Sequence, residues 1–365
     1  MKTTKAKKLR SGFTTGAAAA AAAKGAILAL LTNSPPQKVR ITFLTGAKKD
    51  IALKKLSLES PQCAVATVIK DAGDDPDITH KAEIGVRLSL TRSDHGQKVL
   101  ISGGKGVGTI TKPGLEIAPG HAAINPGPLR MITNEVREIL DQHNCSKSVK
   151  VEVFVPKGEE LALKTLNARL GIVGGLSILG TTGIEHPMSH EAYLATIEKS
   201  LCVAKACGVD QVVLTTGRRS ERFAQELWPQ KPAEAFVQMG DFFKATLNRA
   251  ASKAFAGIIV VVFFGKALKM AMGIPHTHAL RSQLTLTQLA DWTYEQSHAK
   301  KMAAEIRSAN TARQAFYLLK KDHLAVIRLV AKKVHSWSGH FAELNTNIRV
   351  IILDYEGHAI AEHSG

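Results

Sequence analysis

The chain has 365 residues, of which 45% are hydrophobic and 22% are charged, and this balance is typical of a globular protein large enough for two domains. Its formal net charge of +17 is either general surface charge or the sign of an anionic partner, nucleic acid or a polyanionic small molecule. Because only 5% of the residues are aromatic and no nucleic-acid-binding motif is present, the sequence favours the small molecule.

The basic N-terminal residues and the alanine-rich run after them resemble a signal peptide at first sight. Lys24 interrupts the apolar run 17–31, and Thr14-Thr15-Gly16 has the composition of a helix start, so we expect a helix of the mature protein instead. No stretch of about 18 residues is both apolar and uncharged, and we therefore expect no membrane span. The four cysteines lack CxxC spacing, which argues against disulfides or zinc and favours the cytoplasm.

Between residues 1 and 170, strands and helices alternate irregularly, which predicts an α+β domain. Helices are expected over 14–31, 128–142 and 158–166. Strands are expected over 39–44, 50–58, 64–69, 83–90, 98–102 and 149–155. The first two of these strands would form a hairpin around Gly46.

From residue 171 to 365 the rhythm is regular, with continuous apolar strands between helices. This pattern predicts an α/β domain with a mainly parallel, Rossmann-like sheet covered on both faces. Strands are expected over 176–179, 211–214, 235–238, 258–264 and 348–353. Helices are expected over 189–207, 220–227, 241–255 with Asp241 as its cap, and most of 284–334.

Glycines and threonines follow three of these strands. The segments are Gly180-Thr181-Thr182-Gly183, Thr215-Thr216-Gly217 and Gly265-Lys266. Glycine lets backbone N–H groups approach a ligand without an intervening Cβ, and the carboxyl ends of parallel strands lie along one edge of a sheet. The sequence therefore predicts one ligand-binding rim. A valine at Gly180 should block the ligand and leave the fold intact.

A second glycine cluster, Gly103–Gly108, follows the strand expected over 98–102. The β-branched residues and proline of 109–113 come next, so no helix N-terminus faces this loop and a nucleotide site is not indicated. We interpret the cluster as a flexible substrate loop or a tight hairpin.

Three polar clusters are candidates for chemistry. Asp71, Asp74, Asp75, Asp77 and His80 form an acidic turn that could bind a hard cation, supply a base, face lysines of the same site or simply be solvated. His276 and His278 have the i, i+2 spacing of metal ligands in a strand, but no third ligand is apparent, which favours hydrogen bonds to a substrate carboxylate. Arg218, Arg219 and Arg222 either bind carboxylates or form a solvent-facing helix start.

Five separated segments together resemble one family, the CbiD proteins. The segments are GFTTG at 12–16, DAGDDPDITH at 71–80, GVGTITKPGLEIAPGHAAINP at 106–126, 167–189 and 265–278. The resemblance covers nearly the whole chain, and the segment 106–126 is the most specific. The chain departs from the family pattern at Ala18, where members often have cysteine, and at Ala279, where many have serine. A thiol at position 18 is therefore not required here.

CbiD proteins are the cobalt-precorrin-5B (C1) methyltransferases of the anaerobic cobalamin pathway. The resemblance implies transfer of a methyl group from S-adenosylmethionine to C1 of cobalt-precorrin-5B, giving cobalt-precorrin-6A. Cobalt would arrive in the substrate, so no metal is expected in the protein. Precorrins are polycarboxylate tetrapyrroles with many acetate and propionate side chains, which fits a basic chain. A homo-oligomer is left open.

The resemblance also implies roles for the two expected domains, with the active site between them. Residues 171–365 would bind S-adenosylmethionine through Gly180, Thr181, Thr182, Gly183, Thr216, Gly217 and Gly265. Residues 1–170 would face the tetrapyrrole. The residues expected to bind it are Thr14, Thr15, Lys105, Lys112, Asn125, Arg130 and His276. The candidates for a catalytic base or proton donor are Asp74, His80 and His278.

The sequence leaves two alternatives to this function open. One is a different small-molecule transferase that uses the same threonine–glycine rim. The other is a non-catalytic basic protein that binds a tetrapyrrole or nucleic acid.

Overall fold

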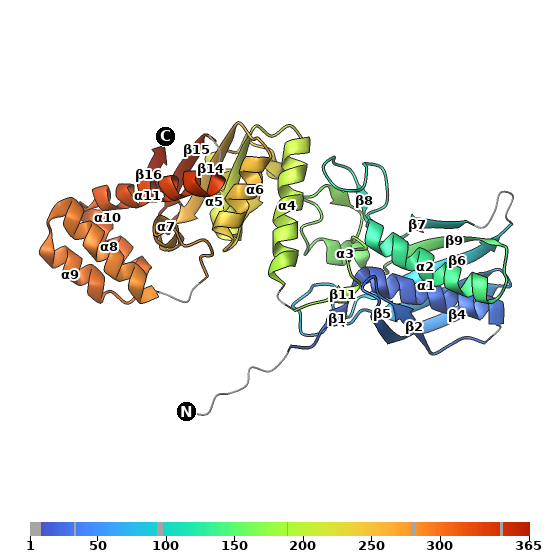
Figure 1. Ribbon diagram of the computed structural model, residues 1–365. Coiled ribbons are helices and arrows are strands. Elements are labelled where there is room, and N and C mark those ends of the chain that lie inside the picture. The colour runs from blue at the N-terminus through green and yellow to red at the C-terminus, as the bar shows by residue number, and fades with distance from the viewer. Residues whose placement is uncertain (1–8, 33, 93–97, 188, 279–281, 344–345) are drawn as a thin grey trace, which may run out of the picture. The chain divides into compact units, whose positions relative to one another are not determined.

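The structure is a computed structural model that describes residues 9–32, 34–92, 98–187, 189–278, 282–343 and 346–365. The chain forms two compact units, Met1–Ser189 and His190–Gly365 (Figure 1). The division falls later than the boundary expected at residue 170, because the stretch before Ser189 is hydrogen-bonded into the first unit. The Gly16 N–H donates to the Leu179 carbonyl at 3.0 Å, and the Asn125 N–H donates to the Ile178 carbonyl at 2.9 Å.

The first unit is α+β, as its sequence predicts, and is built on a five-stranded sheet of order β4-β5-β6-β9-β7. The strands are β4 Lys55–Ser60, β5 Cys63–Ile69, β6 Glu83–Thr91, β9 Ser148–Phe154 and β7 Val99–Gly103. Neighbours are antiparallel except β7 and β9, which are parallel. Alternate residues of β6, such as Ile84, Val86 and Leu88, are fully buried, as expected for a sheet with one covered face.

Shorter strands and one short helix complete this unit. They are β1 Gly12–Phe13 paired with β11 Ile184–Glu185, β2 Lys38–Thr42 with β3 Lys48–Ala52, β8 Thr109–Ile110 with β10 Ile172–Val173, and α3 Gly158–Ala162. The predicted hairpin around Gly46 is confirmed as β2–β3, and Gly46 has a φ of +84°, which glycine adopts without strain.

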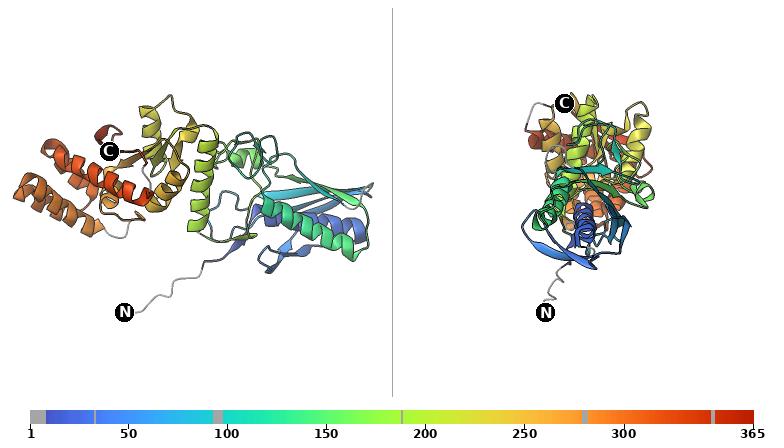
Figure 2. Two further views of the ribbon diagram at one scale, coloured as in Figure 1. Left: turned by 45° about the horizontal axis from the view of Figure 1, so that its top comes forward. Right: turned by 90° about the vertical axis from the view of Figure 1, so that its right-hand side faces the viewer.

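Two long helices, α1 (Thr15–Thr32) and α2 (Pro126–Gln142), lie side by side across one face of this sheet (Figure 2). The helix α1 is long and apolar enough to cross a membrane, with a mean hydropathy of 1.4. However, 78% of its residues are buried inside the protein, and α2, β5 and β6 pack against it. Burial of this extent is the pattern of a core helix, as the sequence predicts.

Buried charges join the two helices. The Lys24 Nζ of α1 lies 2.6 Å from the Glu135 Oε2 and 2.8 Å from the Glu138 Oε2 of α2. Burial disfavours the ammonium, but the two carboxylates outweigh that effect and raise the Lys24 pKa. Glu135 also accepts the Thr42 N–H at 2.6 Å through its other oxygen, so this ion pair connects α1, α2 and β2.

Replacing Lys24 with methionine is expected to lower the free energy of unfolding by about 3 kcal/mol, because the nearly buried Glu135 loses its counter-charge. Urea denaturation of the full chain measures this loss. Lys38→Met is the matched control, since Lys38 is 73% exposed and its nearest carboxylate oxygen, on Asp50, is 4.0 Å away. The control should change stability by less than about 0.5 kcal/mol. Equal losses in the two variants would contradict the structural role of Lys24.

The second unit contains a mixed five-stranded sheet of order β13-β12-β14-β15-β16. The strands are β12 Gln211–Thr215, β13 Phe236–Gln238, β14 Gly257–Phe263, β15 Ile348–Leu353 and β16 Ala359–Ser364. The first four run parallel, and β16 is antiparallel to β15. The sheet therefore only partly matches the mainly parallel, Rossmann-like sheet expected, and the sequence pattern missed β16.

Helices account for most of the remaining second unit. They are α4 His190–Ala206, α5 Arg218–Leu227, α6 Phe243–Ser252, α7 Phe264–Ala271, α8 Ser282–Ser297, α9 Lys300–Ser308, α10 Ala312–Asp322 and α11 Leu324–Ala342. The helix α5 packs on β12, β13 and β14, whereas α11 packs on β15 and β16. Within this unit α8, α9 and α10 gather at the end away from α4 (Figure 1).

Two local expectations are wrong. The run 176–179 is not a strand of the parallel sheet. Leu176 and Ile178 form only single parallel bridges, to Val107 and Ile124 of the first unit. Asp241 does not cap a helix either, since α6 begins at Phe243 and has no side-chain cap. The Asp241 carboxylate is instead bonded to side chains that follow β14.

Candidate functional site

The carboxyl ends of β12 and β14 form the place in the second unit where a ligand is most expected. These two strands are neighbours, and Thr215 of β12 pairs with Val261 of β14. After β12 the chain continues to β13 on one side, and after β14 it continues to β15 on the other side. In open α/β sheets, ligands bind outside the carboxyl ends of the strands where the direction of the connections reverses in this way.

The loop after β12 contains two of the predicted cofactor-binding residues, Thr216 and Gly217. The Thr216 N–H donates to the Ser220 Oγ at 3.1 Å, and the Ser220 Oγ donates to the Gly217 carbonyl at 3.0 Å. Gly217 has an extended φ of 163°, and a Cβ at this position would meet no atom within 4 Å. The helix α5 starts at the next residue without a side-chain cap, so its first-turn N–H groups are available to an anionic group.

The end of β14 passes directly into α7 and carries Gly265, the third predicted residue of this rim. A Cβ at Gly265 would lie 3.6 Å from the Tyr355 Oη and 3.7 Å from the Ala312 Cβ, which are ordinary contacts. The fold itself therefore has room for a side chain at both Gly217 and Gly265. Thr216, Gly217 and Gly265 thus lie at one sheet edge, at the ends of neighbouring strands.

Asp241, in the turn after β13, fixes the segment that carries the predicted histidines. Its Oδ1 accepts the Thr277 Oγ1–H at 2.9 Å and pairs with the Lys266 Nζ, and its carbonyl accepts the Thr277 N–H at 2.9 Å. Sequence reasoning missed this role of Asp241. Asp241 follows β13 and Lys266 follows β14, so only the order of the strands brings the two residues together.

His276 and His278 therefore lie in the second unit, close to the same edge. The His276 ring stacks on His190 with centroids 5.3 Å apart and lies edge-on to Phe242 at 4.8 Å. The His278 ring is 6.3 Å from that of His276. A pocket of about 450 Å³ is lined by Phe242, Lys244, Ala245, Asn248, Pro275 and His276.

The environment of His276 disfavours the charged form of its imidazole. Burial and the neighbouring His190, His278 and Lys266 lower the His276 pKa below its usual value. Its Nε2 is buried and has no hydrogen-bond partner within the described chain. A neutral imidazole of this kind can accept a proton or a hydrogen bond from a ligand. The described residues include no cluster of three or more side chains that could hold a metal ion.

The loop after β15 also reaches this edge, and Asp354 holds it. Asp354 is 1% exposed, and its Oδ1 accepts the N–H groups of Glu356 at 3.0 Å and His358 at 2.8 Å. Its Oδ2 lies 3.0 Å from the Lys320 Nζ. Burial alone would raise the Asp354 pKa, but Lys320 and the His358 N–H outweigh it and bring that pKa to about 2.

This low pKa predicts a pH-dependent contribution to stability. The pKa of Asp354 is lower in the folded chain than in the unfolded chain, so its stabilisation is complete above the unfolded value of 3.8 and is lost as pH falls through about 2. Asp354→Asn should therefore cost about 2 kcal/mol at pH 7, and the difference from the unmodified chain should close between about pH 5 and pH 2. Denaturation curves at several pH values measure it. A difference that is constant with pH would contradict this role of the charge.

Two of the predicted substrate-binding residues, Thr14 and Thr15, are buried at the start of α1. The Thr14 Oγ1 accepts the Ala17 N–H at 3.2 Å as a helix cap. The Thr15 Oγ1 accepts the Leu179 N–H at 2.9 Å. Thr14 and Thr15 are 4% and 2% exposed, and the hydrogen bonds described for both hydroxyls are within the first unit.

The segment Gly180–Gly183, with Thr181 and Thr182, lies in the first unit and is not part of the sheet edge of the second. Gly180 has a φ of +133°, and a Cβ there would lie 2.3 Å from the Thr14 Oγ1. Gly183 has a φ of +94°, and its Cβ would lie 2.6 Å from the Phe43 Cδ1. Close packing against the fold requires glycine at both positions, so a substitution there would disturb the first unit whether or not a ligand binds.

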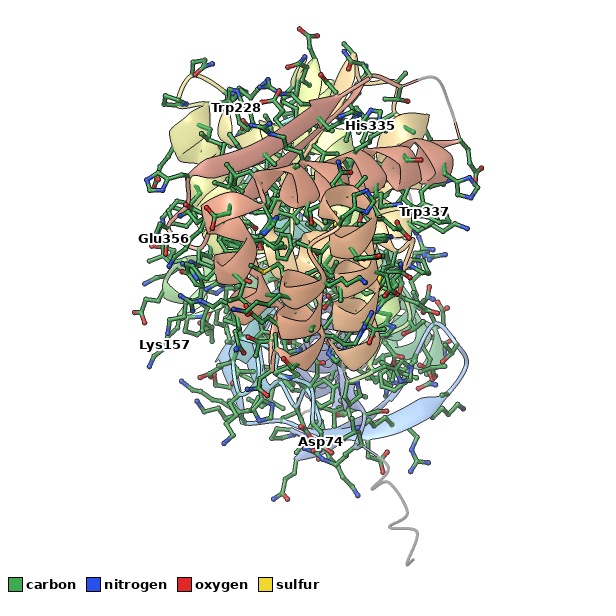
Figure 3. The ribbon with its side chains drawn as sticks, turned by 90° about the vertical axis from the view of Figure 1, so that its left-hand side faces the viewer. Asp74, Lys157, Trp228, His335, Trp337 and Glu356 are labelled. Atoms are coloured by element: carbon green, nitrogen blue, oxygen red, sulfur yellow. The ribbon has the colours of Figure 1, made fainter. Side chains whose placement is uncertain are left out.

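The acidic turn that contains Asp74 and His80 is paired within the first unit. The Arg10 guanidinium binds Asp71 and brings the Asp71 pKa to about 2, and the Arg10 N–H donates to the Asp74 Oδ2 at 2.7 Å. The His80 Nδ1 accepts the Ala72 N–H at 3.1 Å. Asp74 itself is exposed at the surface (Figure 3). The basic partners of this turn are thus Arg10 and Lys70. Lys70 pairs with Asp77.

Apart from His276, the remaining predicted substrate-binding residues also lie in the first unit. Lys105 and Arg130 are exposed, whereas Lys112 and Asn125 are half-buried. Asn125 precedes α2 and its side chain makes no cap hydrogen bond. The glycine cluster around Lys105 forms a tight turn, closed by the Val107 N–H donating to the Gly104 carbonyl at 3.1 Å. Ala279 lies outside the described residues.

Comparisons with known proteins identify the family. Residues 2–187 match the family model described as CbiD, and residues 276–364 match the model described as the CbiD C-terminal domain. The cobalt-precorrin-5B C(1)-methyltransferase of Priestia megaterium is 43% identical over 308 residues, which are 84% of this chain and 83% of the relative. The protein of the same name from Geobacter metallireducens is 41% identical over 362 residues, covering 96% and 97%.

A solved structure is also similar, the cobalamin biosynthesis protein CbiD from Archaeoglobus fulgidus. It is 26% identical, and the match covers 70% of this chain and 78% of that chain with a TM-score of 0.39. The family models and the identities to the curated relatives lead to one conclusion. The chain belongs to the CbiD family.

Proposed function

We propose that this chain transfers a methyl group from S-adenosylmethionine to C1 of cobalt-precorrin-5B, giving cobalt-precorrin-6A in cobalamin biosynthesis. The observation that carries the proposal is the name shared by relatives that are more than 40% identical over most of the chain, cobalt-precorrin-5B C(1)-methyltransferase. This name does not favour the non-catalytic alternative. It also does not favour a different small-molecule transferase, because it specifies this reaction.

The carboxyl edge of the second unit supports the assignment of the methyl donor to Thr216, Gly217 and Gly265. Gly217 faces open space, and the first turn of α5 has no side-chain cap. The Thr215 Oγ1, at the end of β12, is buried without a hydrogen-bond partner in the described part of the chain. An open glycine, free N–H groups and an unpaired hydroxyl fit a ligand with an amino-acid carboxylate and ribose hydroxyls.

When bound, S-adenosylmethionine supplies an electrophilic methyl group on a sulfonium. The protein's main task is to hold donor and macrocycle in line, because orientation provides most of the acceleration in a transfer of this kind. Formation of the new C–C bond uses an electron pair of the macrocycle, and a proton must later leave it. The His276 and His278 rings lie 6.3 Å apart, and the environment disfavours the charged form of His276, so this pair is the proposed acceptor of that proton.

Asp241 is a positioning residue in this scheme, because it holds Thr277 between the two histidines. Asp74 and His80 are proposed to stabilise the first unit, since their described contacts are with backbone groups of Arg10 and Ala72. The cobalt of the substrate needs no ligand from these residues. Lys105, Lys112, Asn125 and Arg130 remain proposed contacts of the tetrapyrrole.

The direct test is an anaerobic assay with the full chain, cobalt-precorrin-5B and S-adenosylmethionine labelled in its methyl group. The proposal predicts label in the corrinoid product and one S-adenosylhomocysteine released for each methyl group transferred. Binding of the macrocycle without any transfer of label would instead support the non-catalytic alternative.

A further inference from the structure

Arginine and aromatic side chains gather at the carboxyl edge of the second unit, on the β14–β15 side. This arginine–aromatic cluster consists of Arg219, Arg222, Phe223, Phe263, Arg313, Tyr317 and Tyr355. We propose that it binds the acetate and propionate carboxylates of the tetrapyrrole substrate, next to the methyl donor. The inference rests on the proposed function and adds a substrate-binding surface to it.

The centre of the cluster is a stacked aromatic pair with an arginine over each ring. Phe263 at the end of β14 and Tyr355 after β15 are nearly parallel, at 7°, with centroids 5.9 Å apart. The Arg219 Cζ lies 5.0 Å from the Phe263 centroid, and the Arg313 Cζ lies 4.7 Å from the Tyr355 centroid. Stacking of this kind holds a guanidinium in place while its N–H edge stays free for a carboxylate.

A third arginine extends the cluster along α5. The Arg222 Cζ lies 4.7 Å over the Phe223 ring, and Phe223 is edge-on to Phe263 at 6.1 Å. All three arginines are exposed. The three guanidinium groups come from α5 and from α10, which are far apart in the sequence, so the cluster is a product of the fold and not of a local run of basic residues.

The charge of the cluster is only partly neutralised by the protein. Arg222 lies 3.7 Å from Glu226, and Glu356 accepts the Tyr317 hydroxyl at 2.8 Å and lies 3.6 Å from Lys320. In the described ranges, no carboxylate oxygen is within 4.0 Å of a side-chain nitrogen of Arg219 or Arg313. Arg219 donates instead to the Tyr355 carbonyl. Arg313 is hydrogen-bonded to Tyr317, and Tyr317 and the more distant Glu356 carboxylate raise the Arg313 pKa.

Two exposed guanidinium groups without a carboxylate within 4.0 Å in the described ranges favour a ligand with several carboxylates. S-adenosylmethionine fits this requirement poorly, because it has one carboxylate and a positively charged sulfonium. A precorrin has many carboxylates around a flat conjugated ring, and each can accept a charge-assisted hydrogen bond from an arginine.

The cluster adjoins the proposed donor site through Tyr355. A Cβ at Gly265 would be 3.6 Å from the Tyr355 Oη, and Asp354 fixes the start of the loop that carries Tyr355 and Glu356. Carboxylates bound here would place the macrocycle beside the donor, which is where methyl transfer needs it.

The test measures the binding of cobyrinic acid, a corrinoid with free carboxylates, to the full chain by absorbance titration. Replacing both Arg219 and Arg313 with glutamine is expected to weaken cobyrinic acid binding about 100-fold, roughly tenfold for each charge-assisted contact. The affinity for S-adenosylhomocysteine should stay within about twofold, since the donor residues are unchanged. Fully esterified cobyrinic acid should bind weakly to both proteins. Circular dichroism checks that the double variant is folded.

Arg349→Gln is the matched control. Its guanidinium lies 5.8 Å over the Trp228 ring but is neutralised by Glu362, with hydrogen bonds of 2.6 and 2.9 Å. Unchanged cobyrinic acid affinity in the double variant, an equal loss in Arg349→Gln, or tight binding of the esterified form would each overturn the inference. If S-adenosylhomocysteine fails to bind the unmodified chain while the arginines still control cobyrinic acid binding, the proposed donor is wrong and the cluster stands.

Discussion

Replacing Gly217 with valine is expected to weaken binding of S-adenosylmethionine by at least about 100-fold and to leave the fold intact. The φ of 163° is extended backbone that valine adopts easily, and a Cβ meets no protein atom within 4 Å. The change at the N-cap of α5 costs about 1 kcal/mol or less. The branched side chain would occupy the space next to the first-turn N–H groups, where the ligand is proposed to bind. Calorimetry with S-adenosylhomocysteine measures the affinity, and thermal unfolding measures the stability of the fold.

Gly339→Val is the matched control for this substitution. A Cβ at Gly339 also meets no atom within 4 Å, and the residue lies in the last turn of α11, which leads to the amino end of β15. The variant should bind S-adenosylhomocysteine as the unmodified chain does. Unchanged affinity in Gly217→Val would show that the donor binds elsewhere.

The second large effect is expected on stability, from the substitution of Gly180 by valine. A φ of +133° strains a β-branched residue by roughly 1–3 kcal/mol, and the Cβ would lie 2.3 Å from the Thr14 Oγ1. Overpacking adds about 1–3 kcal/mol, so the total of about 2–6 kcal/mol is a large part of the roughly 5–15 kcal/mol that stabilise a typical domain. We expect the first unit to unfold, or its chemical denaturation midpoint to fall sharply.

This outcome separates two uses of glycine. If Gly180 left space for a ligand, the valine variant would keep its stability and lose ligand affinity. The structure predicts the reverse, because the peptide around Gly180 is bonded to the start of α1 through Leu179 and Gly183. A variant that is as stable as the unmodified chain would contradict the described packing of Gly180 on Thr14.

Long apolar strands and helices could be predicted from the sequence, because their patterns are local. The β-branched run of β14 and the alanine-rich α1 are examples, and both lie within a residue or two of the expected bounds. The run 176–179 has the same apolar character as a short strand. Its partners are Thr15 and Asn125, more than 50 residues away, and no local pattern shows them.

Some residues of the candidate site could also be predicted from local patterns, and others could not. Thr216, Gly217 and Gly265 could be predicted because each follows a strand whose end is visible in the sequence. His276 and His278 stood out by spacing, and the arginines of α5 by their position after β12. Asp241, Arg313 and Tyr355 could not be assigned, since strand order and the position of α10 bring them to the edge. The sequence contains the arginines and the aromatic residues, but it does not show that their side chains stack in the fold.

A crystal structure of the full chain with S-adenosylhomocysteine would show whether the carboxyl edge between β12 and β14 holds the methyl donor. We expect ligand density against Thr216, Gly217 and Gly265, with the amino-acid carboxylate at the first turn of α5. Density in the first unit, against Gly180–Gly183, would contradict it.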